Sequence, residues 1–175
     1  MKMQIPVKMQ RVVALAAIPE GVAGTKATLA LMVNLAQQSR YDFAVRNQAL
    51  KLVQTLPSKN YMAEVEAIHK YVRDDIRYVK DIDGIETVAS PRETMLSGQG
   101  DCDDKALLAA ALLMGLGHQV RFVAVGDAPG DFSHVLIETM VGRRWWPVET
   151  TEPVDVGWYP TSLPYRLVYY VPPAR

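Results

Sequence analysis

The sequence contains one cysteine and has no net charge, and both features exclude classes of function. Cys102 is the only cysteine among 175 residues, so an internal disulfide cannot form and a reducing compartment is favoured. Nineteen Lys and Arg residues balance nineteen Asp and Glu residues, so no overall field attracts the protein to nucleic acid or to an anionic membrane. We therefore expect no nucleic-acid partner.

Long apolar runs are also missing. No segment reaches the ~18 apolar residues that a membrane-spanning helix needs, so we expect no membrane insertion. The run from 11 to 18 follows two lysines and has the general form of a signal peptide, but it is of minimal length and rich in β-branched residues. We expect a cytoplasmic protein, with export as the weaker alternative.

The sequence has no CxxC or HExxH motif, and the aspartates near Cys102 lack the regular ligand spacing of a known calcium loop. We therefore expect no metal and no cofactor. Asp101 is predicted to cap the helix that follows it, and Asp103 and Asp104 to compensate its dipole. Arg77 or Arg121 is the predicted partner of these carboxylates.

The composition, 49% hydrophobic and 22% charged, is that of a globular protein, and without a repeat or linker we expect one domain over 1–175. Apolar spacing predicts helices over 25–38 and 41–56, after one or two strands within 1–20. A third helix, capped by Asn60 or Ser58, carries an apolar stripe of Met62, Val65, Ile68, Val72 and Ile76.

Two features of the middle of the chain are expected to lie outside the core. His69 is next to the stripe of the third helix and is predicted to be a partly exposed surface residue, since nothing pairs it with a nucleophile. The segment from Tyr78 to Gly100 is polar and irregular and is predicted to be a long loop over the next helix.

Cys102 opens the most distinctive segment, in which two glycines precede the cysteine and a helix apolar on every side follows it to Gly117. A helix of this kind is expected in a core. The helix start favours a thiolate at Cys102, whereas the neighbouring aspartates oppose it. A strong nucleophile here needs a cationic partner, and the chain has only three histidines.

The partner is predicted from the strands that follow, over 120–125, 133–141, 144–149 and 166–171. If the second and third of these form a hairpin turning at Gly142, His134 and Glu149 are nearly opposite each other. A carboxylate beside an imidazole supports the imidazolium that forms when the ring takes a thiol proton. Cys102, His134 and Glu149 are therefore the candidate catalytic residues.

Several of these segments together resemble a known family. Gly98-x-Gly-Asp-Cys-Asp-Asp-Lys, then Ser133-His134-Val135, then Trp-x-Pro-Val-Glu-Thr are similar to motifs of the transglutaminase-like superfamily of papain-like cysteine enzymes. The recognisable core covers about 61–152, with 1–60 as an N-terminal extension. The resemblance is to small stand-alone members from bacteria and bacteriophages.

The resemblance implies an α+β fold in which the nucleophile begins a central helix packed on an antiparallel sheet. It implies a Cys-His-Asp triad on Cys102, His134 and the position of Glu149, where this chain has Glu instead of the usual Asp. The oxyanion donors would be the backbone N–H of Cys102 and a second group, for which Tyr78 and Gln99 are the candidates.

Two functions remain open from the sequence. The first is cysteine-dependent acyl transfer on peptide or amide bonds through a thioester, chiefly hydrolysis as in a protease or amidase, with transamidation as a variant. Its substrate would be a peptide or protein. The second is a binding or assembly protein with a weakened triad, for example in a phage or cell-envelope process. The oligomeric state is not predicted.

Overall fold

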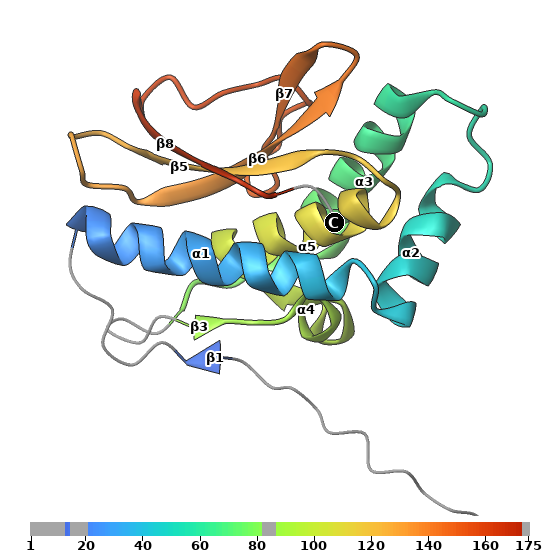
Figure 1. Cartoon of the computed structure of the whole chain (residues 1–175), viewed down its shortest axis with the longest axis horizontal. Helices are drawn as coiled ribbons and strands as arrows, with labels where there is room; N and C mark the ends of the chain where they lie inside the picture. Colours follow the sequence, from blue (N-terminus) through green and yellow to red (C-terminus); the bar gives the residue numbers. More distant parts are fainter. Residues whose placement is uncertain (1–12, 15–20, 82–86, 173–175) are drawn as a thin grey trace, which may run out of the picture.

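The computed structural model of the chain describes residues 13–14, 21–81 and 87–172. Its helices lie on one side of an antiparallel sheet, which gives the predicted α+β architecture (Figure 1). Most of the segment in which N-terminal strands are predicted lies outside the described residues. The part that is described, β1 (Val13–Ala14), pairs antiparallel with β3 (Thr87–Val88).

The three predicted N-terminal helices are present as α1 (Gly21–Ser39), α2 (Phe43–Val53) and α3 (Tyr61–Asp75). Asn60 caps α3, because its side chain accepts a hydrogen bond from the Ala63 N–H at 3.2 Å. The apolar stripe of α3 faces the core as predicted, with four members buried and Met62 half-buried.

The prediction of a simple loop from Tyr78 to Gly100 is wrong. The segment contains α4 (Pro91–Ser97), which Ser90 caps and Gly98 ends with a φ of 64°. Parallel strands β2 (Arg77–Tyr78) and β4 (Gln99–Gly100) tie both ends of the segment together. A helix this short shows too little apolar periodicity to be recognised, although Ser-Pro followed by Glu93 is an N-terminal signal.

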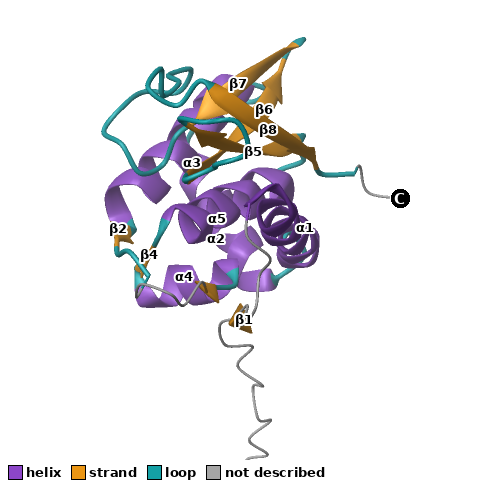
Figure 2. Cartoon of the chain, turned by 90° about the vertical axis from the view of Figure 1, so that its left-hand side faces the viewer, coloured by secondary structure: helices purple, strands orange, loops and turns teal. Residues whose placement is uncertain are grey.

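The predicted central helix is α5 (Cys102–Gly115), and its side chains from Asp104 to Met114 are buried. It lies between the other helices and the sheet (Figures 1 and 2). Asp101 caps it by accepting hydrogen bonds from the N–H groups of Asp103 and Asp104 at 3.0 and 3.1 Å. Gly117, with a φ of 97°, follows its last turn, as the sequence predicts.

The sheet has the order β7-β6-β5-β8 and is antiparallel throughout. Its strands are β5 (Val120–Gly126), β6 (His134–Val141), β7 (Arg144–Val148) and β8 (Tyr165–Tyr170). One face packs on α5, which joins β5 and β6 to the main core. The turn between β6 and β7 contains Gly142 with a φ of 65°, so the predicted hairpin is confirmed.

None of the helices in the described part of the chain is long and apolar enough to cross a membrane.

Candidate active site

Cys102 and His134 line the same cavity, which has a volume of about 370 Å³. The start of α5 supplies Cys102, and the start of β6 supplies His134. The third wall is α1, which contributes Thr25, Thr28 and Met32 among others. Helix α1 therefore lines the same cavity as the two motif residues Cys102 and His134.

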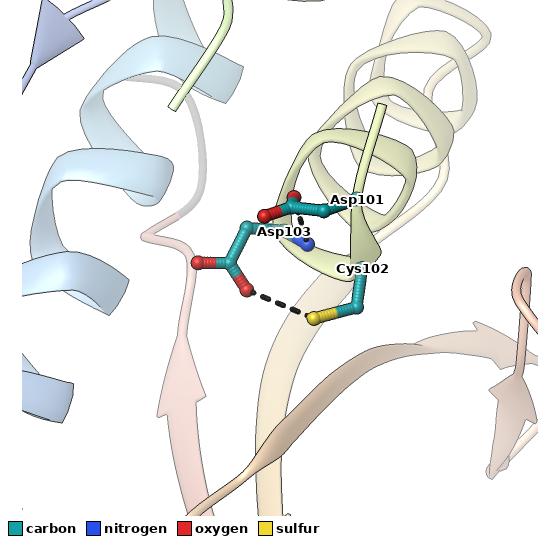
Figure 3. A group of neighbouring side chains, drawn as sticks. All are labelled: Asp101, Cys102 and Asp103. Carbon is teal, nitrogen blue, oxygen red and sulfur yellow. Dashed lines mark hydrogen bonds between the residues drawn. The ribbon is translucent and has the colours of Figure 1, made fainter. Parts of the chain in front are cut away.

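Cys102 is half-buried at the first position of α5. Its Sγ lies 3.5 Å from an Asp103 carboxylate oxygen (Figure 3). The same sulfur is close to the backbone N–H of Val135. Burial and the negative charges of Asp103 and Asp101 raise the pKa of the thiol well above its ordinary value, and the Val135 N–H opposes them only in part. At neutral pH the resting group is therefore a thiol, because burial, together with the two aspartates, outweighs the favourable helix start.

His134 is bonded to Glu149 as the hairpin prediction requires, with 2.7 Å between His134 Nε2 and Glu149 Oε2. The last pair of the β6–β7 register is Ile137 with Val148, so Glu149 continues it opposite Leu136, two residues from His134 and within diagonal reach on the same face. Because Nε2 is engaged by the carboxylate, Nδ1 is the ring nitrogen that remains to exchange a proton with Cys102.

Glu149 is fully buried directly after β7. Its Oε1 accepts hydrogen bonds from the Thr151 N–H at 2.7 Å and the Thr151 hydroxyl at 2.6 Å, while Oε2 faces His134. Burial alone would raise its pKa, but the bonds from His134 and Thr151 outweigh burial and lower the pKa to about 2. Glu149 is therefore a carboxylate that can stabilise an imidazolium at His134.

The prediction that His69 is a partly exposed surface residue is wrong. This histidine is only 3% exposed, and its Nε2 donates to the backbone carbonyl of Glu149 over 2.6 Å. Burial lowers its pKa. Its position next to the apolar stripe was a hint of burial, but its partner comes from 80 residues further along the chain, so no local pattern could identify it.

The two candidate oxyanion residues lie near the cysteine, but neither lines the cavity. Tyr78 pairs with Gly100 and is 50% exposed; burial of its hydroxyl, then the charge of Cys102, raise its pKa. Gln99 Oε1 accepts a hydrogen bond of 2.6 Å from Arg77. The structure brings both residues to the segment before the nucleophile, and their roles stay predictions.

The predicted contacts between the aspartates and arginines are wrong. Arg77 bonds to Gln99, and Arg121 pairs with Glu138 at 2.6 Å. Asp104 instead uses one oxygen to accept from the Ala89 N–H at 2.7 Å and the other to accept from the Asp101 N–H at 3.3 Å. The partners of Asp104 are therefore backbone groups, which a search for opposite charges does not find.

Asp101, Cys102 and Asp103 bring one ligand atom each to within 4.8 Å of one another (Figure 3). Burial and the charges of Asp103 and Asp104 raise the pKa of Asp101 to about 7. Calcium takes six to eight oxygen ligands, whereas this group offers two carboxylates and a thiol, and the carboxylate of Asp104 is committed to backbone N–H groups. The group therefore fits helix capping better than a calcium site.

Comparison with known proteins identifies one family for this chain. A family profile described as the transglutaminase-like superfamily matches residues 46–150, which is more than half of the chain and begins within α2. The match therefore includes residues that the sequence analysis assigned to an N-terminal extension. A search of curated protein sequences found no match.

Solved structures with the same fold are distant in sequence. A proposed protease from Parabacteroides distasonis has a TM-score of 0.58 at 16% identity, over 85% of this chain and 32% of that one. A proposed cysteine protease from Cytophaga hutchinsonii has a TM-score of 0.50 at 19% identity, over 73% of this chain and 46% of that one. Calcium-bound LapG of Legionella pneumophila has a TM-score of 0.53 at 17% identity, over 81% and 87% of the two chains. The chain thus spans less than half the length of the two proposed proteases, and the likeness concerns the fold.

Proposed function

Because this chain belongs to the transglutaminase-like superfamily, we propose that it catalyses cysteine-dependent acyl transfer on peptide or amide bonds. The observation that carries the proposal is the contact of 2.7 Å between His134 and the buried, ionised Glu149, at the edge of a cavity that Cys102 shares. A histidine supported in this way accepts a thiol proton more readily than an isolated one.

In the proposed reaction His134 Nδ1 takes the proton of Cys102 as Sγ attacks the carbonyl carbon of the substrate. The C–N bond of the tetrahedral intermediate then breaks, His134 returns the proton to the leaving amine, and a thioester remains on Cys102. Water, deprotonated by His134, attacks the thioester; the C–S bond breaks to release the acid, and His134 returns the proton to the sulfur of Cys102. Glu149 stays ionised throughout and stabilises the imidazolium at His134 in both halves of the cycle.

The negative charge on the substrate oxygen needs hydrogen-bond donors at the start of α5. Asp101 takes the N–H groups of Asp103 and Asp104 as the helix cap, so the N–H of Cys102 remains for the oxyanion. We propose Tyr78 or Gln99 as the source of a second donor, since Gln99 lies in β4, which ends just before Cys102, and Tyr78 lies in β2, which pairs with β4.

Hydrolysis of a peptide or protein is the favoured form of the reaction. Two of the structurally similar proteins are proposed proteases, which supports a peptide substrate. Water needs no binding site of its own, so it is the simpler acceptor than an amine.

A binding or assembly protein is the second candidate, and one observation favours it. The pKa of Cys102 is raised by its burial and by two aspartates, which is the opposite of the usual tuning of a cysteine nucleophile. A chain that keeps the fold and the cavity but has lost an efficient nucleophile would show this environment.

The two candidates differ in whether Cys102 becomes acylated. The test uses p-nitrophenyl acetate and intact-mass spectrometry, with Cys102→Ala and His134→Ala as controls. We expect a burst of nitrophenol and one acetyl group on Cys102 of the wild type, no acetyl group in Cys102→Ala, and slower acylation in His134→Ala. Equal, slow acylation of the wild type and His134→Ala would favour the binding protein.

A further inference from the structure

The backbone carbonyl of Glu149 needs a partner, because it lies in the core where β7 has ended. The ladder between β6 and β7 extends only to Val148, and Glu149 is fully buried. A buried carbonyl without a donor costs about 1–3 kcal/mol. The donor here is His69 Nε2 of α3, at 2.6 Å.

We infer that His69 is a positioning residue of the active site, which holds the Glu149 backbone so that its carboxylate meets His134. This inference rests on the proposed function, because it assigns His69 a role in that same triad. His69 would touch neither substrate nor nucleophile, and would act only through Glu149.

The other contacts of Glu149 do not fix its backbone relative to the core. Thr151 binds Oε1, but it is only two residues away and moves with the same loop. His134 is the group to be oriented. His69 is the contact that ties the Glu149 backbone itself to α3, whereas the bond from Arg73 to the Val154 carbonyl, at 2.8 Å, joins the same loop to α3 five residues further on. Glu has one more rotatable bond than Asp, so it needs such a tie more than Asp does.

A second buried polar residue connects the same helix to the nucleophile. Lys105, one turn after Cys102 on α5, is 1% exposed, and its Nζ donates to the carbonyls of Arg73 and Ile76 at 3.2 and 2.7 Å. The helix of Cys102 and the loop of Glu149 are therefore both hydrogen-bonded to α3. Helix α3 thus fixes the distance between the two halves of the proposed site.

The chain offers a matched control, a second histidine that is hydrogen-bonded to α3. His118, after α5, binds Glu64 of α3 at 2.7 Å, and its side chain is 5% exposed. Both histidines thus join α3 to a distant segment through a buried ring nitrogen, but His118 does not contact the residues of the proposed site. Loss of either should lower stability, and only loss of His69 should change the chemistry of Cys102.

The choice of variants follows from which ring nitrogen is used. A Gln side chain places its amide nitrogen near the position of histidine Nε2, whereas the shorter Asn places it near that of Nδ1. Because His69 bonds through Nε2, His69→Gln should preserve the contact with Glu149 and His69→Asn should lose it. The two variants are equally polar, so they separate positioning from burial cost.

The experiment measures the alkylation rate of Cys102 by iodoacetamide between pH 5 and pH 10 for His69→Gln, His69→Asn, His69→Leu, His118→Leu and His134→Ala, with thermal unfolding of each. We expect His69→Asn and His69→Leu to react about tenfold or more slowly than wild type near pH 7, with a profile shifted toward that of His134→Ala. His69→Gln should retain most of the rate, and His118→Leu should melt earlier with an unchanged profile.

Equal rates in His69→Gln and His69→Asn, with the wild-type profile, would overturn the positioning role. If His134→Ala lowers the rate while the His69 variants do not, the proposed function stands and only this inference fails. If His134→Ala also has no effect, the proposed function itself fails. Should His69→Leu not fold, the pair of amide variants still decides.

Discussion

The two ends of α5 carry opposite charge, and only one of the two charge patterns follows from helix physics. At the C-terminal end a cavity of about 870 Å³ is lined by Arg40, Arg46 and His118 together with Trp145 and Tyr170. Cationic side chains around the last carbonyls of a helix compensate its dipole. The positive charge around this larger cavity is therefore explained by the end of the helix, without a catalytic role.

The N-terminal end of α5 carries more negative charge than is needed to compensate the helix dipole. Asp101 and Asp103 lie beside Cys102, and the pKa of Asp101 rises to about 7 because burial and the charges of Asp103 and Asp104 oppose its own charge. A single capping aspartate would be enough to accept hydrogen bonds from the free N–H groups of the first turn. A local cost of this kind at the mouth of a cavity is typical of a functional site, so the smaller cavity, not the larger, is the one to test.

The largest expected effect is on the triad. Glu149→Gln keeps the shape but removes the charge that stabilises the imidazolium, so we expect acylation of Cys102 to fall by up to about 10⁴-fold, as for the equivalent change in a serine protease triad. The matched change at the other end of α5 is Glu64→Gln, which alters the partner of His118. It should leave the acylation rate unchanged in stopped-flow or mass-spectrometric assays. A similar loss in both variants would remove the distinction between the two ends.

The next effect concerns acid stability. The pKa of Glu149 is lowered from 4.5 to about 2, so its ionised form contributes stability that is complete above its unfolded pKa and is lost as the pH falls from about 4.5 to about 2. The shift corresponds to about 3 kcal/mol. Urea unfolding at pH 6 and pH 3 should show a smaller loss of the free energy of unfolding in Glu149→Gln than in the wild type. An equal loss would mean that Glu149 is not held as an anion in the fold.

A smaller effect on stability is expected at Lys105. Lys105→Met removes the donor to the Arg73 and Ile76 carbonyls, which would lower the free energy of unfolding by about 2 kcal/mol. Lys70→Met, at an exposed position of α3, is the control and should stay within about 0.5 kcal/mol of the wild type. Chemical denaturation measures both. If the two variants unfold alike, α3 is not tied to α5 through this lysine.

The smallest effect sharpens the role of the acidic end. Asp101→Asn keeps an N-cap side chain but removes a negative charge near Cys102, so it should lower the pKa of the thiol and speed its alkylation several-fold. Because the Asp101 carboxyl has a pKa of about 7, wild type and variant should differ above pH 7 and converge below it. Rates that are equal at pH 9 would show that this charge does not act on Cys102.

The sequence predicts most of the C-terminal half of the fold, because the strands and the hairpin turn there are marked by residues close together in the chain. Alternating β-branched residues mark the strands, and Gly142 sets the hairpin, from which the contact between His134 and Glu149 follows by counting residues. The buried central helix is equally plain, since Ala106 to Met114 is apolar on every side.

What the sequence does not predict depends on contacts between distant segments. His69 is buried because the loop after β7 folds over α3, and α1 reaches the cavity because it packs on α5. The short helix α4 is not predicted for another reason: its seven residues are too few to show helical periodicity of apolar side chains. The raised pKa of Cys102 also needed the structure, because only the folded protein shows how far burial adds to the neighbouring charges.

The most direct test of the account is the rate of Cys102 alkylation by iodoacetamide against pH in the wild type and in His134→Ala, since it needs no knowledge of the substrate. The wild type should react at least about tenfold faster than His134→Ala near pH 7, because His134 receives the thiol proton. Superimposable profiles that rise only near or above the ordinary thiol pKa of about 8.5 would contradict it.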